Sequence, residues 1–222
     1  MAALGGAAEP SLKLALLRAT DPEARAAKRF IETRYLDVFG SHAPVRYSNL
    51  LVLTDKLGKT AAALGIRRAS RESLFLEQYL DVAAEQAIAT TAGPATRRES
   101  IVELGSFAAG SSRVATYLVC AMAAYMQHQG FSHALVTSTG RLRRLFALFD
   151  FDLETLGDAR KDVLPDGGES WGLYYDDAPR VLAGSVQHCF EAVLRERDRQ
   201  AIKARRDIID SLILQARTLP SC

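Results

Sequence analysis

The sequence lacks the features that mark membrane-spanning, nucleic-acid-binding and disulfide-stabilised proteins. Its longest apolar run, Val114 to Met126, has thirteen residues, whereas a membrane-spanning helix needs about twenty. No block of five or more Lys or Arg occurs and the formal net charge is only +2, so nothing favours a nucleic-acid partner. The three cysteines, Cys120, Cys189 and Cys222, are odd in number and unpatterned, which indicates a reducing, cytoplasmic location.

Several cofactor and catalytic motifs are also missing. The sequence has no Gly-x-x-x-x-Gly-Lys-Ser/Thr and no Gly-x-Gly-x-x-Gly string, so neither common nucleotide-binding fingerprint applies. It has no Gly-x-Ser-x-Gly elbow, which argues against a serine hydrolase. The four histidines show no metal-ligand spacing, so we expect neither a metal site nor a permanently bound cofactor.

The residues that are present suit an α/β protein. Of the 222 residues, 48% are hydrophobic and 24% are charged, as in ordinary globular domains. Strand-like and helix-like segments alternate, which favours a sheet flanked by helices. We expect a loose tail over residues 1–10, without the basic region of a secretory signal, a single domain over 11–188, and an amphipathic C-terminal helix over 189–222.

Apolar periodicity and turn residues set the expected order of elements. We expect strands at residues 12–18, 49–54, 60–68, 100–104, 133–139, 171–175 and 181–187, and helices at 21–38, 113–129 and 141–149. Residues 75–80 are ambiguous, whereas the composition of 89–99 and 157–170 predicts loops.

The most informative unit is residues 98–139, which combines an apolar strand, a Gly/Ser turn, an apolar helix and a second strand. The small residues of the turn leave backbone N–H groups at the helix start free for an anion. With the nucleotide fingerprints absent, a phosphate-bearing acyl carrier is the expected ligand. The expected donor contacts are Leu104, Gly105, Ser106, Phe107, Ser111, Ser112, Arg113 and Thr137. The serines could instead cap the helix, and Arg113 could simply lie exposed in its first turn.

Four strings resemble the thermostable hemolysin family, and the resemblance covers roughly residues 12–188. They are Arg29-Phe30-Ile31 with Arg34-Tyr35, Leu74-Phe75-Leu76-Glu77-Gln78-Tyr79-Leu80, Ile101-Val102-Glu103-Leu104-Gly105, and Trp171-Gly172-Leu173-Tyr174-Tyr175. The resemblance implies a GNAT-like (acyl-CoA N-acyltransferase) mixed sheet flanked by helices. In that fold two parallel strands splay apart and the pantetheine arm of the donor lies between them. A more distant similarity is to acyl-homoserine-lactone synthases, although the spacing of their Arg/Phe-rich helix differs.

The resemblance implies an N-acyltransferase that moves an acyl chain from acyl carrier protein or coenzyme A to the amine of an amino acid or similar small molecule. A membrane-lytic hemolysin and a non-catalytic GNAT-like binding module are the alternatives. Glu103, near the end of a central strand, is the expected general base. It could instead form an ion pair with Arg97, Arg98 or Arg113.

The expected acceptor contacts lie elsewhere in the chain. Arg29 and Arg34 could bind a carboxylate through paired hydrogen bonds. They lie about 140° apart on a helix, so only one should face the site. Glu77 could hold an ammonium group or form a surface salt bridge, and Tyr79 and Thr139 complete this set.

Two further predictions concern the end of the chain. Trp171 and Tyr175 could wall an acyl pocket, with an aromatic core as the alternative. The C-terminal helix could pack on the sheet or on a second copy in a homodimer. Its basic residues could instead dock an acyl carrier protein through Arg195, Arg199, Lys203 and Arg206.

Overall fold

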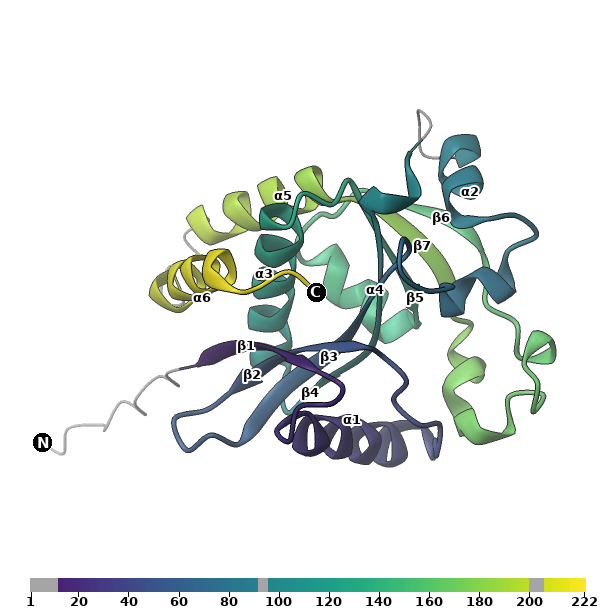
Figure 1. Ribbon diagram of the computed structural model, residues 1–222, viewed down its shortest axis with the longest axis horizontal. Coiled ribbons are helices and arrows are strands. Elements are labelled where there is room, and N and C mark those ends of the chain that lie inside the picture. The colour runs from purple at the N-terminus through teal and green to yellow at the C-terminus, as the bar shows by residue number, and fades with distance from the viewer. Residues whose placement is uncertain (1–11, 92–95, 200–205) are drawn as a thin grey trace, which may run out of the picture.

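The computed structural model describes residues 12–91, 96–199 and 206–222. Within these residues the strands form one mixed sheet in the order β1-β2-β3-β4-β5-β7-β6 (Figure 1). The strands are β1 (Lys13–Arg18), β2 (Asn49–Thr54), β3 (Thr60–Arg68), β4 (Ile101–Ala109), β5 (His133–Ser138), β6 (Leu153–Asp158) and β7 (Arg180–Ser185). The helices are α1 (Ala24–Phe39), α2 (Ala84–Thr91), α3 (Ser112–His128), α4 (Gly140–Ala147), α5 (Val186–Asp198) and α6 (Arg206–Thr218). The predicted α/β class is therefore confirmed.

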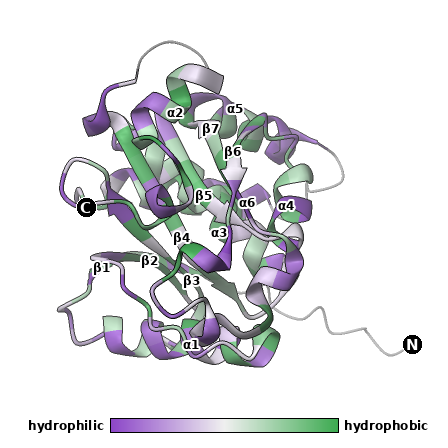
Figure 2. Ribbon diagram, turned by 90° about the vertical axis from the view of Figure 1, so that its right-hand side faces the viewer, coloured by the Kyte–Doolittle hydropathy of each residue, from purple (hydrophilic) through white to green (hydrophobic). Residues whose placement is uncertain are grey.

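Helices cover both faces of the sheet. α3 packs with α5 and α6 on one face, and α1 covers β2, β3 and β4 on the other (Figure 1). Every residue from Tyr117 to Met126 in α3 is buried, so the long apolar run is a core helix, as its length predicted. Figure 2 shows the central strands coloured mainly hydrophobic, whereas α1 carries stretches of both kinds. No helix in the described part of the chain is long and apolar enough to cross a membrane.

Two parallel strands diverge in the middle of the sheet. β4 pairs with β5 from Ile101 to Leu104 only, although both strands continue further. Beyond that point β4 follows β3 through a bulge, in which β4 carries one extra residue between Gly105 and Ala108. Ser106 lies in this bulge with φ 50°, and such bulges bend a strand away from its neighbour. The splay that the family resemblance implied is present.

One expected strand near the C-terminus was wrong, and another strand was missed. The segment predicted as a strand at 171–175 forms a 3₁₀ segment, η4 (Glu169–Asp177). Its aromatic residues have high strand propensity, but Gly168 and Gly172 have positive φ values of 81° and 54° and turn the chain. The strand that pairs with β7 is instead β6, which carries Gly and acidic residues and was not predicted.

Two other segments gained helical structure. Residues 75–79 form a 3₁₀ turn, η1 (Phe75–Tyr79). The predicted loop 89–99 begins inside α2, because helix-forming residues such as Ala84 and Glu85 precede it.

The predicted C-terminal helix is two helices, α5 and α6. α5 begins at Val186, directly after β7, and Ser185 caps it by accepting a hydrogen bond from the His188 amide at 3.4 Å. α6 joins the main core through buried Ile209, Leu212 and Ile213, which favours the packing alternative. The predicted tail over residues 1–10 lies outside the described residues, as does Lys203.

Candidate active site

A cavity of about 520 Å³ opens where β4 and β5 diverge. Its walls come from α1, the end of β4, the start of α3, the end of β5, and α4, with Tyr174 of η4. A volume of this size is typical of small-molecule sites. The predicted site residues that line it are Arg34, Gly105, Ser106, Phe107, Ser111, Ser112, Thr137 and Thr139. Those that do not line it are Arg29, Glu77, Tyr79, Glu103, Leu104, Arg113, Trp171 and Tyr175.

The start of α3 forms one edge of the cavity. Ser111 caps the helix, since its Oγ accepts a hydrogen bond from the Val114 amide at 3.3 Å. The other amides of the first turn have no acceptor within the helix, and the helix dipole makes this end positive. Arg113 in the same turn is exposed. This edge can therefore receive an anion through its backbone N–H groups.

Two polar atoms on the cavity wall have no partner within the described residues. They are Arg34 Nε and Thr137 Oγ1, and both are buried. Arg34 keeps only a weak ion pair with Asp37, at 3.5 Å from its Nη1. Buried polar atoms are rarely left unpaired, because each costs about 1–3 kcal/mol. A ligand with matching polar groups would satisfy both atoms.

The cavity wall carries positive charge. Arg141 and Arg144 of α4 lie on it together with Arg34, whereas no Asp or Glu is found among its described lining residues. Arg29 is exposed on α1 and away from the cavity, so one arginine of the predicted pair faces the site. The two α4 arginines were missed, although the string Arg141 to Arg144, directly after a strand, is visible in the sequence.

Aromatic side chains close the cavity between α1 and η4. The Tyr174 ring stacks on the Tyr35 ring, with 6.2 Å between the ring centres, and makes an edge contact with Phe39, with 5.2 Å between the ring centres. Its hydroxyl donates to the Thr137 carbonyl at 3.2 Å, which ties η4 to the end of β5. These three rings give the cavity an apolar wall.

The rings predicted to wall an acyl pocket lie elsewhere. Trp171 packs against Phe75 at 5.7 Å, and the hydroxyls of Tyr79 and Tyr175 lie 2.6 Å apart. This cluster joins η1 to η4. Its position favours the aromatic-core alternative for Trp171 and Tyr175.

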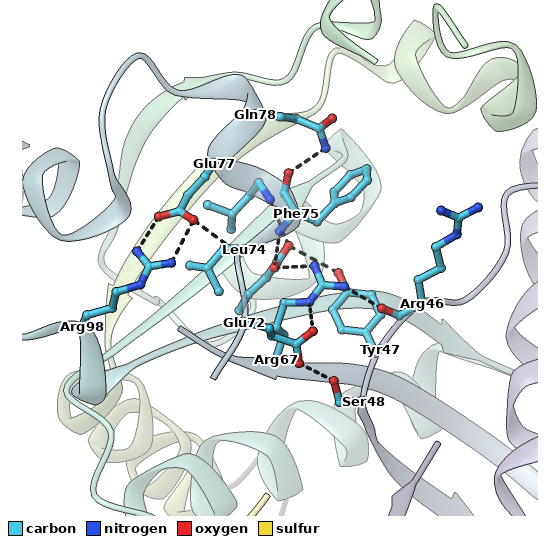
Figure 3. Close-up of polar contacts among 12 residues, drawn as sticks. Arg46, Tyr47, Ser48, Arg67, Glu72, Leu74, Phe75, Glu77, Gln78 and Arg98 are labelled. Carbon is cyan, nitrogen blue, oxygen red and sulfur yellow. Dashed lines mark hydrogen bonds and ion pairs between the residues drawn. The ribbon is translucent and has the colours of Figure 1, made fainter. Parts of the chain in front are cut away.

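Glu103 does not line the cavity and is held in a polar network that includes Tyr47, Arg67 and Phe75, which Figure 3 labels. Its side chain is only 1% exposed. Oε2 accepts from Arg67 Nη1 at 3.1 Å and from the Phe75 amide at 2.8 Å. Oε1 accepts from the Leu76 amide at 3.2 Å and lies 3.5 Å from the Tyr47 hydroxyl. Burial raises the pKa of the Glu103 carboxyl, while Arg67 and the two amides oppose that shift.

The ion-pair partner of Glu103 is therefore Arg67, and not one of the three arginines considered from the sequence. Arg67 also binds Glu72 at 3.0 Å and the Arg46 carbonyl. Its guanidinium carbon lies 4.8 Å from the centre of the Tyr47 ring. Strand pairing places Arg67 beside Glu103, a relation that only the register of β3 and β4 could have predicted.

Glu77 belongs to a second network and not to the cavity (Figure 3). Its carboxylate binds Arg98 at 2.6 and 3.0 Å and accepts from the amides of Leu74 and Ala84 at 3.1 Å each. The Arg98 hydrogen bond, followed by these amides, lowers the pKa of Glu77 against the effect of burial. This geometry favours the salt-bridge alternative for Glu77.

Solved structures of other proteins share this fold. FeeM, an N-acyl amino acid synthase from uncultured soil microbes, is similar with a TM-score of 0.57 and 16% identity, covering 90% of this chain and 99% of its own. BjaI, a CoA-dependent acyl-homoserine lactone synthase solved with SAM and isopentyl-CoA, has a TM-score of 0.54 and 12% identity. The match covers 95% of this chain and 91% of BjaI. The acyl-homoserine lactone synthase LasI has a TM-score of 0.54 and 10% identity, and the match covers 83% of this chain and 94% of LasI. At these identities the likeness establishes the fold.

The fold and its splayed cavity thus define a GNAT-like α/β protein. Residues 17–190 match the thermostable hemolysin family. The chain belongs to that family. No curated protein matches the sequence.

Proposed function

We propose that this protein is an N-acyltransferase that moves an acyl chain from a carrier thioester to the amine of an amino acid or similar small molecule. The observation that carries the proposal is the cavity at the β4–β5 splay. It combines a helix N-terminus with two buried polar atoms, Arg34 Nε and Thr137 Oγ1, that have no partner among the described residues. One side thus suits the phosphate of a donor, and the other suits a polar acceptor.

The start of α3 is the proposed donor site. Its free amides and dipole suit the phosphates of coenzyme A or of a phosphopantetheine arm. The splay leaves the β4 residues beyond Leu104 without a partner strand on the β5 side. Gly105, Ser106 and Phe107 line the cavity there, so a pantetheine arm could run beside them.

Arg34 is the proposed acceptor-binding residue. A guanidinium binds a carboxylate through two parallel hydrogen bonds, and the Nε of Arg34 is buried without a partner among the described residues. An amino acid brings both this carboxylate and the amine that attacks. The similarity to an N-acyl amino acid synthase supports an acceptor of this kind.

Glu103 is the proposed general base for the attacking amine. Burial raises the pKa of this carboxyl, which suits a group that must take a proton near neutral pH. Catalysis would be direct attack of the amine on the thioester, without a covalent enzyme intermediate.

The test is an assay of the purified protein with a panel of donors and acceptors. Long- and short-chain acyl-CoA and acyl carrier protein are each mixed with the common amino acids, and mass spectrometry detects N-acylated products. Absence of any acylated product across the panel would refute the proposal.

A lysis assay separates this function from the membrane-lytic alternative. Liposomes are incubated with the protein, with and without acyl donor. Lysis that requires donor would indicate an amphiphilic product of acyl transfer, and lysis without donor would favour a toxin.

A further inference from the structure

We propose that Tyr47 is a catalytic residue that carries the proton from the acceptor amine to Glu103. The inference rests on the proposed function. Tyr47 lies in the segment between α1 and β2, which carries no motif that marks it in the sequence.

Glu103 is closed off from substrate by the groups that already bind it. The carboxylate is 1% exposed and does not line the cavity. Four donors, two on each oxygen, occupy the directions in which it can accept hydrogen bonds. A substrate amine therefore cannot reach Glu103 directly. A proton can reach it only through one of the groups already bound.

Only one kind of group around Glu103 can pass a proton. The amides of Phe75 and Leu76 and the guanidinium of Arg67 donate hydrogen bonds but cannot accept them. The Tyr47 hydroxyl donates and accepts. It is thus the one donor around Glu103, among the residues the structure describes, that can take a proton on one side and release one on the other.

Two glycines on neighbouring strands make room for the Tyr47 side chain next to the cavity wall. A Cβ on Gly65 would overlap the Tyr47 ring, and a Cβ on Gly105 would overlap the hydroxyl oxygen. Gly105 lines the cavity, and it has no side chain to cover the hydroxyl. Tyr47 is not itself a lining residue, but its hydroxyl lies against Gly105, which is one, and 3.5 Å from Glu103 Oε1, so it can link the cavity wall to Glu103.

The proton moves in two coupled transfers. The amine nitrogen attacks the thioester carbonyl, so that the N–C bond forms and the C–S bond breaks. The N–H proton passes to the Tyr47 oxygen while the hydroxyl proton passes to Glu103 Oε1. The thiolate leaves with the C–S electron pair, and Glu103 returns the proton to it by the same route.

The main variant is Tyr47→Phe, which keeps the ring over both glycines and removes only the hydroxyl. We expect kcat to fall by about 10²-fold or more, in the range of general-base assistance, with the donor KM unchanged. Tyr125→Phe is the matched control. It also removes a tyrosine hydroxyl, which donates to the Pro220 carbonyl at 3.0 Å, and Tyr125 does not line the cavity. It should keep its kcat.

Two further measurements separate a relay from a structural role. In a double-mutant cycle with Glu103→Gln, residues of one relay should give a combined loss no larger than either single loss. Gly105→Ala should also lower kcat, because its Cβ would displace the Tyr47 hydroxyl although the variant removes no titratable group. Additive losses, or a normal kcat in Tyr47→Phe, would overturn the relay in an active enzyme. An inactive wild type would instead refute the proposed function, and the relay with it.

Discussion

Replacing Glu103 with glutamine tests both the stability and the chemistry of the buried network. The carboxylate accepts four hydrogen bonds, whereas an amide accepts on its oxygen alone. With its oxygen toward Arg67 and the Phe75 amide, the new side chain would point its NH₂ at the Tyr47 hydroxyl and the Leu76 amide. Tyr47 can turn and accept, but the Leu76 N–H is left buried and unpaired.

The expected cost follows from these contacts. One unpaired buried amide costs about 1–3 kcal/mol, and the lost charge on the Arg67 pair adds to this. Arg67 keeps Glu72 at 3.0 Å, so its own charge is not left alone. We therefore expect Glu103→Gln to lower the free energy of unfolding by about 2–4 kcal/mol, a drop in Tm of roughly 5–15 °C. Turnover should fall by about 10²–10⁴-fold as the base is removed.

Denaturant unfolding and single-turnover kinetics measure the two effects separately. Glu72→Gln is the control, because it removes a half-buried partner of the same arginine and should cost less stability and keep turnover. Near-normal turnover in folded Glu103→Gln would refute the role as base. An unchanged unfolding free energy would refute the account of the network.

The pH dependence has a defined sign. Burial raises the pKa of Glu103 above its ordinary value of 4.5, so the folded protein holds this proton up to a higher pH than the unfolded chain does. This group's contribution to stability is full below that ordinary value and is lost as the pH rises through the folded-state pKa. The base must be ionised, so turnover should instead rise over the same interval. Both effects of Glu103 should be absent in Glu103→Gln. They are checked by measuring the free energy of unfolding and the turnover rate as functions of pH.

The cavity and its surroundings give three more predictions. Arg34→Ala should raise the KM for amino acids at least tenfold but leave the KM for acceptors without a carboxylate unchanged. Arg29→Ala should change the KM for neither kind of acceptor. Coenzyme A or a carrier arm should protect residues 105–113 in hydrogen exchange, and unchanged protection at saturation would contradict the donor site. Reversing Arg195 and Arg199 to Glu should raise the KM for carrier-bound donor but not for a small pantetheine thioester, and equal losses would indicate a structural role.

The sequence predicted the parts of the fold that depend on local patterns. Two apolar runs joined by a hairpin turn marked β2 and β3, and a longer apolar run marked α3. The cavity edges at Ser111 and Thr137 followed from the strand–turn–helix–strand order. Each of these features is encoded by consecutive residues: about twenty for the hairpin and for α3, and residues 98–139 for the strand–turn–helix–strand unit.

The rest of the site depends on contacts between distant segments. Tyr47 lies 56 residues from Glu103, and Arg67 reaches it through the pairing of β3 with β4. The aromatic string at 171–175 has strand propensity, but packing on α1 and the positive φ of Gly172 decide its conformation. Tertiary packing overrides a local preference of this size.

The two most specific strings of the family are one physical unit in the folded chain. Glu103 belongs to the string Val-Glu-Leu-Gly. It accepts hydrogen bonds from the amides of Phe75 and Leu76, which belong to the string Leu74 to Leu80. A carboxylate at a buried strand position is costly unless donors surround it. The η1 turn supplies two of these donors, and Glu77 in turn holds η1 to Arg98. The turn is therefore the support that keeps a charged group buried beside the cavity, and loosening it through Glu77→Ala should impair turnover without removing any group that contacts the cavity.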